Sequence, residues 1–448
     1  TRRRFLIWVL ASLPLLVLIL FIVRYRVEVP QADEWSLVPL IDKSYQGTLQ
    51  LKDLWPLHNE HRLLFPRMLL IQIIKISHWQ ILPELITNVL FATISFLAML
   101  SLMKRLNKFA VWLIPLFSLM IFSLNQSENW FLGWNVQIFM NVAAVILGLI
   151  LIGESEFSGR RIVAAALLGI IATYSFANGF LFWPVAFLLL WQKRNSINRS
   201  PIVFSLWILI AAISFAFYIH GYSRPAEHPS PWHFLNEPLS ALNYFFAYLG
   251  SPLLAFCKKT PEAAEWLSRK GFSVPQVIVW IANHAASFAG LIGFLLFIFA
   301  FQKMKKDENS NVVLIFFAMA TYVLLSAVIS TIARSGLGMS NALSLRYITI
   351  SIWFWISLII ISAFEQQLKF KRICLTIVIV CIILNSIYGG MYSIKVHSYL
   401  MPARSEVLRL QDETLLKRLY PDVEYIRKAV PIMKRYNLSV FRGDHHSQ

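Results

Sequence analysis

The chain has 448 residues, of which 57% are hydrophobic and only 14% are charged. A soluble domain carries roughly 25% charged residues, so most of this chain must be solvated by lipid. The formal net charge of +18 does not indicate a nucleic-acid partner, because the basic residues form short clusters between apolar runs and no continuous face. The composition predicts an integral membrane protein and argues against a nucleic-acid-binding one.

The first apolar run, residues 5–23, is long enough to span a bilayer. Arg24 and Tyr25 follow it, where a signal peptide would have small residues at a cleavage site, so we expect a retained first helix. Further runs of the same kind predict an all-α, polytopic bundle of about 11 transmembrane helices. The candidate spans are residues 5–23, 85–103, 109–124, 138–152, 162–176, 180–191, 202–219, 284–301, 312–330, 348–364 and 373–388.

Lys and Arg are distributed unevenly between alternate loops, and short cytoplasmic loops normally hold the positive excess. Two opposing connections, residues 125–137 and 177–179, contain no basic residue. We therefore expect a multi-pass protein of a bacterial inner membrane, with a cytoplasmic N-terminus and a periplasmic C-terminus. The basic residues assigned to the cytoplasmic side are Arg2, Arg3, Arg4, Lys104, Arg105, Lys108, Arg160, Arg161, Lys193, Arg194, Arg199, Lys303, Lys305, Lys306, Lys369, Lys371 and Arg372.

Residues 63–76 are apolar enough to resemble a span, but counting them as one would invert every later loop. Because this run contains Arg67 and Lys75, it is interpreted as an amphipathic helix on the outer interface. Residues 244–256 are interpreted as an interfacial or re-entrant piece. The predicted organisation is a transmembrane domain, residues 1–390, with large periplasmic segments at 24–84 and 220–283, followed by a short, helical periplasmic C-terminal segment, residues 391–448.

Acidic residues and histidines follow the first span. Asp33 and Glu34 lie in a turn that Pro30 and Trp35 would order, and carboxylates near the membrane surface can accept a proton from a sugar hydroxyl or hold a divalent metal beside a lipid phosphate. Asp33 is the preferred catalytic base and Glu34 a close second, because adjacent residues cannot be ranked without geometry; a solvated loop with a helix N-cap is the alternative. The second cluster, of candidate substrate-binding residues, consists of His58, Glu60, His61 and Arg62. Its spacing matches no recognised metal motif, so it indicates metal binding only weakly.

The connection at residues 127–137 is rich in amides and indoles. Tryptophans at an interface are usually membrane anchors, but amides beside aromatic faces are also typical of a sugar-binding cleft. The candidate substrate-binding residues here are Glu128, Asn129, Trp130 and Trp134. Asn178 in a second outer turn is a further candidate, although Asn-Gly is also an ordinary turn pair.

Arg334 and Arg346 stand on the outer connection before the tenth span, with Tyr347 beside the latter. A guanidinium at an interface can simply reach the headgroups. Two of them lie on one loop on the outer side, where the positive excess of cytoplasmic loops makes basic residues uncommon. Their presence there favours bidentate binding of a lipid-linked phosphate.

In layout the chain resembles the GT-C superfamily of polytopic membrane glycosyltransferases, which use polyprenyl-phosphate sugars as donors. The resemblance consists of a first helix, a long outer loop opening on an acidic motif, an interfacial helix, many spans and a periplasmic C-terminal segment. It implies that Asp33 or Glu34 acts as base or metal ligand and that residues 63–76 form the superfamily's interfacial helix. The segments around Glu128, Asn178 and residues 344–347 are also similar to bacterial membrane proteins grouped with these enzymes.

The resemblance implies transfer of a sugar from a polyprenyl-phosphate donor to a cell-envelope glycan or glycolipid, such as an O-antigen or lipopolysaccharide modification. Membrane lipids are further partners, and a divalent metal ion, Mg²⁺ or Mn²⁺, is a candidate cofactor. Two alternatives stay open. A flippase or transporter of lipid-linked sugars would place ionisable residues within the spans, and a polymerase or ligase of undecaprenyl-diphosphate-linked glycans would carry a larger arginine cluster.

Overall fold

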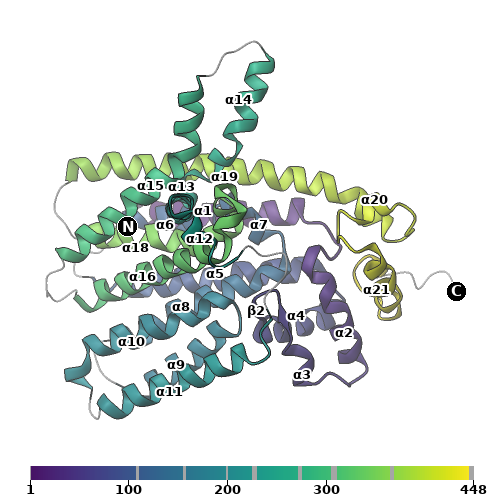
Figure 1. Cartoon of the computed structure of the whole chain (residues 1–448), viewed down its shortest axis with the longest axis horizontal. Helices are drawn as coiled ribbons and strands as arrows, with labels where there is room; N and C mark the ends of the chain where they lie inside the picture. The colour runs from purple at the N-terminus through teal and green to yellow at the C-terminus, as the bar shows by residue number, and fades with distance from the viewer. Residues whose placement is uncertain are drawn as a thin grey trace.

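The computed structural model describes residues 2–106, 110–154, 158–197, 200–223, 230–270, 275–303, 310–363 and 368–442. Within them the chain is helical, and the β-structure described is one antiparallel hairpin of β1 (Leu57–His58) and β2 (His61–Arg62). Figure 1 shows the long helices running along the length of the molecule, with the C-terminal helices at one end and α14 (Thr260–Arg269) standing away from the bundle. The predicted all-α bundle is confirmed.

The helices fall into a long and a short set. The long ones are α1 (Arg2–Tyr25), α5 (Ile81–Met103), α8 (Val136–Gly153), α9 (Gly159–Thr173), α10 (Phe182–Gln192), α11 (Ser200–Ile219), α13 (Pro238–Leu254), α15 (Gln276–Gln302), α16 (Ser310–Arg334), α18 (Ile348–Ala363) and α19 (Leu368–Glu406). The short ones are α2 (Val38–Tyr45), α3 (Leu51–Leu54), α4 (Leu64–Ser77), α6 (Ile114–Ile121), α7 (Ser127–Trp130), α12 (His233–Asn236), α17 (Met339–Ala342), α20 (Glu413–Leu416) and α21 (Val423–Arg435). Short 3₁₀ turns join them, among them η1 (Ala32–Leu37), η4 (Gly133–Asn135), η5 (Ala177–Leu181), η9 (Leu345–Tyr347) and η10 (Ser439–Phe441).

Nine helical stretches in the described residues are long and apolar enough to cross a membrane, so the chain is a multi-pass membrane protein, but the predicted number of eleven is not confirmed. The spans expected at 109–124, 162–176 and 180–191 correspond to α6, α9 and α10, which have 8, 15 and 11 residues. α6 and α10 each have a proline in the first turn, Pro115 and Pro184, and both follow a 3₁₀ turn that shortens the regular helix. The fifth of the nine stretches in chain order, Pro238–Arg269, includes the run 244–256 that was expected to lie at the interface.

The helix expected at residues 63–76 is present as α4. It has 14 residues and ends where His78 adopts a left-handed backbone conformation. α4 is absent from the candidate spans of the described residues, as the amphipathic interpretation requires. Its depth in the membrane stays a prediction.

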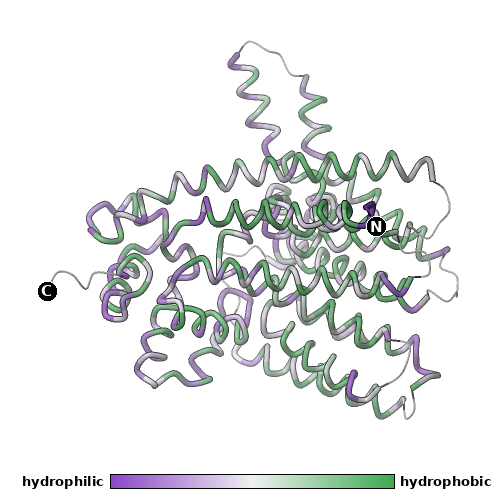
Figure 2. Tube along the Cα trace, turned by 180° about the vertical axis from the view of Figure 1, so that it is seen from behind, coloured by the Kyte–Doolittle hydropathy of each residue, from purple (hydrophilic) through white to green (hydrophobic). Residues whose placement is uncertain are grey.

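Burial separates central helices from peripheral ones. The most apolar window of the stretch containing α8 is 83% buried, whereas those of α1 and α11 are each 17% buried. Figure 2 shows hydrophobic residues along the long helices and hydrophilic ones gathered near their ends. The apolar side chains that α1 and α11 expose therefore face lipid.

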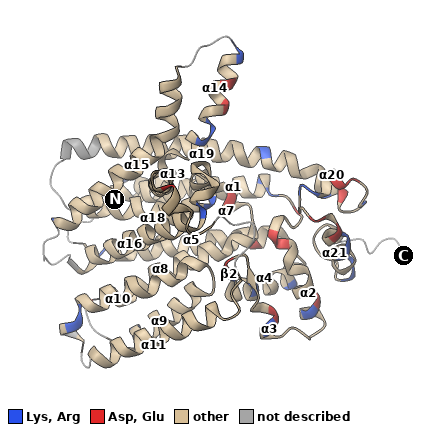
Figure 3. Cartoon of the chain, in the orientation of Figure 1, with Lys and Arg blue, Asp and Glu red and all other residues tan. Residues whose placement is uncertain are grey.

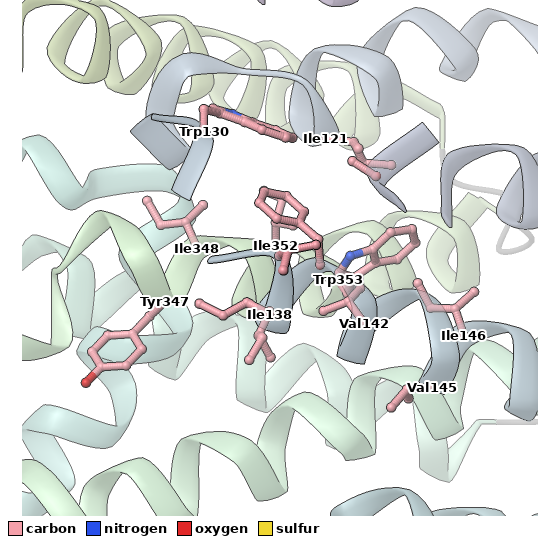
Figure 4. Packing of buried hydrophobic residues seen from close by; sticks show 14 of the residues in the cluster. Ile121, Trp130, Ile138, Val142, Val145, Ile146, Tyr347, Ile348, Ile352 and Trp353 are labelled. Carbon is pink, nitrogen blue, oxygen red and sulfur yellow. The ribbon is translucent and has the colours of Figure 1, made fainter. Parts of the chain in front are cut away.

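One part of the core lies where α8 and α18 meet. Figure 4 shows their aliphatic and indole side chains pointing toward one another: Ile138, Val142, Val145 and Ile146 from α8, and Ile348, Ile352 and Trp353 from the α18 segment. Elsewhere, α13 and α15 pack backbone to backbone. A β-carbon at Gly250 would lie 1.8 Å from the carbonyl oxygen of Ala286, so only glycine permits that approach.

The C-terminal segment closes one end of the bundle. α19 runs without a break through residue 390, where a domain boundary was predicted, and leads into α20 and α21. α21 packs against the segment after α1: the rings of Tyr45 and Tyr436 stack at 4.3 Å, and the Tyr436 hydroxyl donates to Asp42 at 2.8 Å. Figure 3 shows most of the Asp and Glu colour toward this end. Of the basic residues used to predict orientation, Lys108, Arg199, Lys305 and Lys306 lie outside the described residues, as do the span ends Phe109 and Phe364 and the side chains of Lys369, Lys371 and Arg372.

Candidate active site

A cavity of about 640 Å³ opens where the ends of α1, α16 and α19 meet the β-hairpin and the turns η1, η4, η5 and η9. Ten of the fourteen predicted site residues line it: Asp33, His58, Glu60, His61, Glu128, Trp134, Asn178, Arg334, Arg346 and Tyr347. Segments up to 300 residues apart thus meet at one end of the bundle, and the candidate residues do lie together. Glu34, Arg62, Asn129 and Trp130 do not line the cavity.

The turn η1 separates the two adjacent carboxylates. Asp33 lines the cavity with a side chain that is 43% exposed, and His58 Nε2 lies 3.1 Å from its Oδ2. Glu34 is 1% exposed and accepts hydrogen bonds from the backbone N–H groups of Gln31 (2.8 Å) and Trp134 (3.2 Å). Asp33 therefore faces the cavity, whereas Glu34 ties η1 to η4.

Glu34 lies in a buried, acidic environment behind the cavity. Burial raises the pKa of Glu34 to about 7, against the opposing effect of its backbone hydrogen bonds. The second buried carboxyl, that of Glu84, lies across Gly133: a β-carbon there would be 2.1 Å from Glu84 Oε2 and 3.1 Å from Glu34 Oε1. Glycine at position 133 is thus what lets both carboxyls pack against η4.

The β-hairpin is held from behind by two buried arginines. The Arg62 guanidinium donates to the carbonyl oxygens of Tyr218 (2.6 Å), Trp55 (2.9 Å) and His220. Arg67 in α4 donates to the carbonyls of Leu54 and Pro56 in the same way, and burial lowers the pKa of Arg67 to about 10. Arg62, predicted to bind substrate, instead holds the hairpin because its donors are occupied by backbone carbonyls that no local pattern could reveal.

The hairpin is joined to α16 through Glu60. Glu60 pairs with Arg334, and His61 Nε2 lies 3.6 Å from its Oε1. Burial alone would raise the pKa of Glu60, but the charges of His61 and Arg334 outweigh it and lower the pKa to about 2. His61 also stacks on Phe176 at 4.3 Å and accepts a hydrogen bond from the Ala177 N–H. Arg334 thus lines the cavity as one half of an ion pair.

Arg346 differs from Arg334. Its guanidinium lies over the Tyr347 ring at 5.6 Å and has no carboxylate partner among the residues that the structure describes. Glu128 lies nearby, but its Oε2 accepts from the Ser344 hydroxyl (2.7 Å) and from the backbone N–H of Arg346 (3.2 Å). Asn129 donates to the carbonyl of Arg346 and to Thr349, so it positions η9 from outside the cavity.

The two predicted tryptophans have different surroundings. Trp130 is fully buried, stacks on Phe139 at 4.5 Å and donates to the Ser123 carbonyl (2.9 Å), so it belongs to the core of Figure 4. Trp134 lines the cavity and meets the His58 ring edge-on at 4.8 Å. Only Trp134 can contact a ligand.

Ser127 and Gln137 line the cavity with buried polar atoms. The Ser127 hydroxyl and Gln137 Oε1 make no hydrogen bond within the described residues, although the residues are 1% and 5% exposed. Buried polar atoms are nearly always paired, so these two atoms are candidates for binding ligand groups. Gln137 lies in the amide-rich connection but was not among the predicted site residues.

The residues of α19 that line the cavity were not predicted from the sequence either. Tyr392, His397 and Tyr399 line the cavity from α19, and Arg418 lines it from the segment after α20. The Arg418 guanidinium lies over the Tyr399 ring at 4.5 Å and donates to its carbonyl at 3.0 Å. No motif marked these residues, because the cavity face of a helix that is otherwise apolar has no local signature.

The residues at the cavity do not fit a metal site. Within the described part of the chain, no group of three or more His, Cys, Asp or Glu side chains is placed to hold a metal ion. Glu60, a residue of the predicted cluster, is already paired with Arg334.

No family model matches the chain, and no curated protein matches it significantly. Among solved structures, the chain is similar to ArnT from Cupriavidus metallidurans, whose crystal structure contains undecaprenyl phosphate. The likeness covers 97% of this chain and 77% of ArnT, with 11% identity and a TM-score of 0.43.

Proposed function

We propose that the chain is a membrane glycosyltransferase that moves a sugar from a polyprenyl-phosphate donor to a cell-envelope glycan or glycolipid, such as O-antigen or lipopolysaccharide. The observation that carries the proposal is one cavity that combines an accessible carboxylate, Asp33, with an arginine that lacks a carboxylate partner in the described residues, Arg346. The unpaired atoms of Ser127 and Gln137 lie in the same cavity. An acceptor hydroxyl, a lipid phosphate and sugar hydroxyls need these three kinds of group.

The donor phosphate binds at Arg346. A guanidinium without a carboxylate partner can form paired hydrogen bonds to two phosphate oxygens. Arg334 was expected to share this role, but its charge is balanced by Glu60, so it positions the hairpin instead. The sugar then lies toward Trp134, with its hydroxyls in reach of Ser127 and Gln137.

Asp33 acts as the general base. The acceptor hydroxyl oxygen attacks the anomeric carbon, the bond from that carbon to the phosphate oxygen breaks, and its electron pair leaves on the phosphate. Asp33 takes the hydroxyl proton. His58, 3.1 Å from the carboxylate, orients it, and the burial of Glu34 leaves Asp33 as the accessible carboxylate of the adjacent pair.

The periplasmic face of a bacterial inner membrane is the proposed location of this cavity. The distribution of Lys and Arg along the sequence supports an N-terminus in the cytoplasm. The cavity lies at the end of the bundle that carries α20 and α21 (Figure 1), which the same rule assigns to the periplasm.

A ligase acting on diphosphate-linked glycans is the second candidate. A diphosphate leaving group would call for another cation beside Arg346, and Arg418 also lines the cavity. A transfer assay with paired donors discriminates between the two: the proposal expects turnover of the monophosphate-linked sugar, and turnover of only the diphosphate-linked glycan would replace it.

The test of the base is Asp33→Asn. Mass spectrometry of envelope glycans and glycolipids, from cells with the wild-type gene, without it and with the variant, identifies the modification. We expect Asp33→Asn to reduce transfer by about 100-fold or more, with normal membrane insertion. Asp42→Asn is the matched control, because Asp42 lies in the same segment but outside the cavity. Undiminished transfer by Asp33→Asn would contradict the role of Asp33.

A further inference from the structure

A second cavity, of about 760 Å³, lies outside the candidate active site. It is enclosed by the residues after α1, the turn between α4 and α5, the end of α19 and the C-terminal turn η10. Its lining residues are Arg26, Glu28, His78, Trp79, Gln80, Leu82, Arg404, Asn437, Ser439, Val440 and Arg442. None of these residues lines the first cavity.

The cavity carries net positive charge. Three arginines line it against one carboxylate, Glu28, which pairs with Arg26. Arg442 contacts the side-chain oxygen of Gln80 when that amide is oriented to satisfy both groups. Arg404 makes neither an ion pair nor a side-chain hydrogen bond within the described residues. The Arg404 guanidinium is therefore available to an anion, and the Arg442 guanidinium contacts a neutral amide that does not balance its charge.

The backbone around the cavity is held in an uncommon conformation. Four non-glycine residues of its lining have positive φ: His78 (51°), Trp79 (55°), Asn437 (52°) and Ser439 (54°). The two strained turns are tied together, because the Ser439 N–H donates to the His78 carbonyl at 2.9 Å. Residues with such backbone conformations cluster at functional sites.

The cavity adjoins a lipid-facing surface. The outer half of α1 exposes Leu16 (53%), Leu20 (59%) and Val23 (46%), and Arg26 follows three residues after Val23. This exposed apolar face of α1 ends close in sequence to Arg26, which lines the cavity. A lipid phosphate is the anionic group that occurs at this depth.

We propose that this second cavity binds the phosphate of an anionic lipid headgroup, through Arg404 and Arg442, with the acyl chains along α1. The site is independent of the proposed transferase reaction, since it shares no lining residue with the first cavity. Its occupation ties together α1, α5 and the C-terminal segment.

The test is binding of short-chain phosphatidylglycerol to the purified full chain in neutral detergent, followed by native mass spectrometry and by melting temperature. We expect saturable binding and a rise in melting temperature for the wild type. The double variant Arg404→Gln/Arg442→Gln should bind at least about tenfold more weakly, because two charge-assisted hydrogen bonds are lost. Arg409→Gln is the matched control: Arg409 follows α19 at the same end of the chain, is exposed and lies outside both cavities.

Two further probes test the wild type without relying on a variant. Phosphatidylcholine of the same chain length should bind more weakly, and equal binding would mean that the acyl chains carry the interaction, which would overturn the proposal. Inorganic phosphate at the same concentration should have little effect. If it stabilises the protein as much as phosphatidylglycerol does, the cavity is a site for free phosphate and the lipid assignment is wrong. The assignment is also wrong if the double variant binds phosphatidylglycerol like the wild type.

Discussion

The cavity of the candidate active site has two walls that differ in how their charges are used. On the wall made by η1, the β-hairpin and α16, charges face one another: Glu60 with Arg334, and Asp33 with His58. On the wall made by η9 and α19, Arg346 has no carboxylate partner among the described residues. The charges of the first wall are therefore balanced within the protein, whereas Arg346 on the second wall is available to an anion.

The largest effect is expected when the Glu60–Arg334 pair is broken. Both side chains are less than one-fifth exposed, and removing one partner of a buried ion pair costs about 3 kcal/mol. We expect Glu60→Gln to lower the melting temperature markedly and to reduce transfer, while the double variant Glu60→Gln/Arg334→Gln recovers part of the stability. The measurement is a double-mutant cycle of melting temperatures. Additive losses would show that the pair does not hold the hairpin to α16.

The same wall can be tested by the pH dependence of stability, to which Glu34 contributes. Its folded pKa of about 7 lies above the ordinary value of 4.5, so it contributes stability that is complete below about pH 4.5 and is lost as the pH rises through 7. We expect the wild-type melting temperature to fall between pH 5 and pH 8, by the equivalent of about 2 kcal/mol.

The variant Glu34→Gln should lose this slope, although it loses one of the two backbone hydrogen bonds that Glu34 accepts. Asp53→Asn is the matched control, since Asp53 forms the same kind of capping box with Gln50. The pKa of Asp53 is lowered by its hydrogen bond to Lys43, so it stays ionised over that range and its variant should keep the wild-type slope. A Glu34→Gln variant with the full wild-type slope would assign the titration to another group.

Arg346→Ala tests the second wall. Loss of a charge-assisted contact to phosphate is worth about 2 kcal/mol, or about a thirtyfold increase in donor KM. Stability should be unchanged, because the guanidinium has no carboxylate partner in the described residues. Arg62→Ala provides the contrast: its guanidinium donates to three backbone carbonyls, so stability should fall. Unchanged donor KM in Arg346→Ala would remove the phosphate role.

The sequence was sufficient to predict the helical membrane bundle and the gathering of polar segments at one end, because apolar periodicity and the charge of short loops are local properties. It could not rank Asp33 and Glu34. Both lie in one turn, and the Trp134 N–H from which Glu34 accepts a hydrogen bond lies 100 residues away. For the same reason Arg62 resembled a ligand-binding residue: two of the three carbonyls to which it donates belong to Tyr218 and His220, at the end of α11.

The smallest expected effect concerns Gln137, the residue of the cavity that sequence reasoning passed over. Gln137→Leu removes a buried oxygen that has no partner in the described residues, so stability should stay equal or rise. If that oxygen binds a sugar hydroxyl, kcat/KM for the donor should fall about fivefold, which corresponds to a loss of about 1 kcal/mol of transition-state stabilisation. Gln126→Leu is the matched control. Gln126 is equally buried but donates to the Ile121 carbonyl (2.8 Å) and accepts from Thr349 (2.7 Å), so its loss should lower stability. Destabilisation by Gln137→Leu of the same size as by Gln126→Leu would mean that the Gln137 side chain stabilises the fold, which would leave Ser127 as the polar side chain proposed for the sugar hydroxyls.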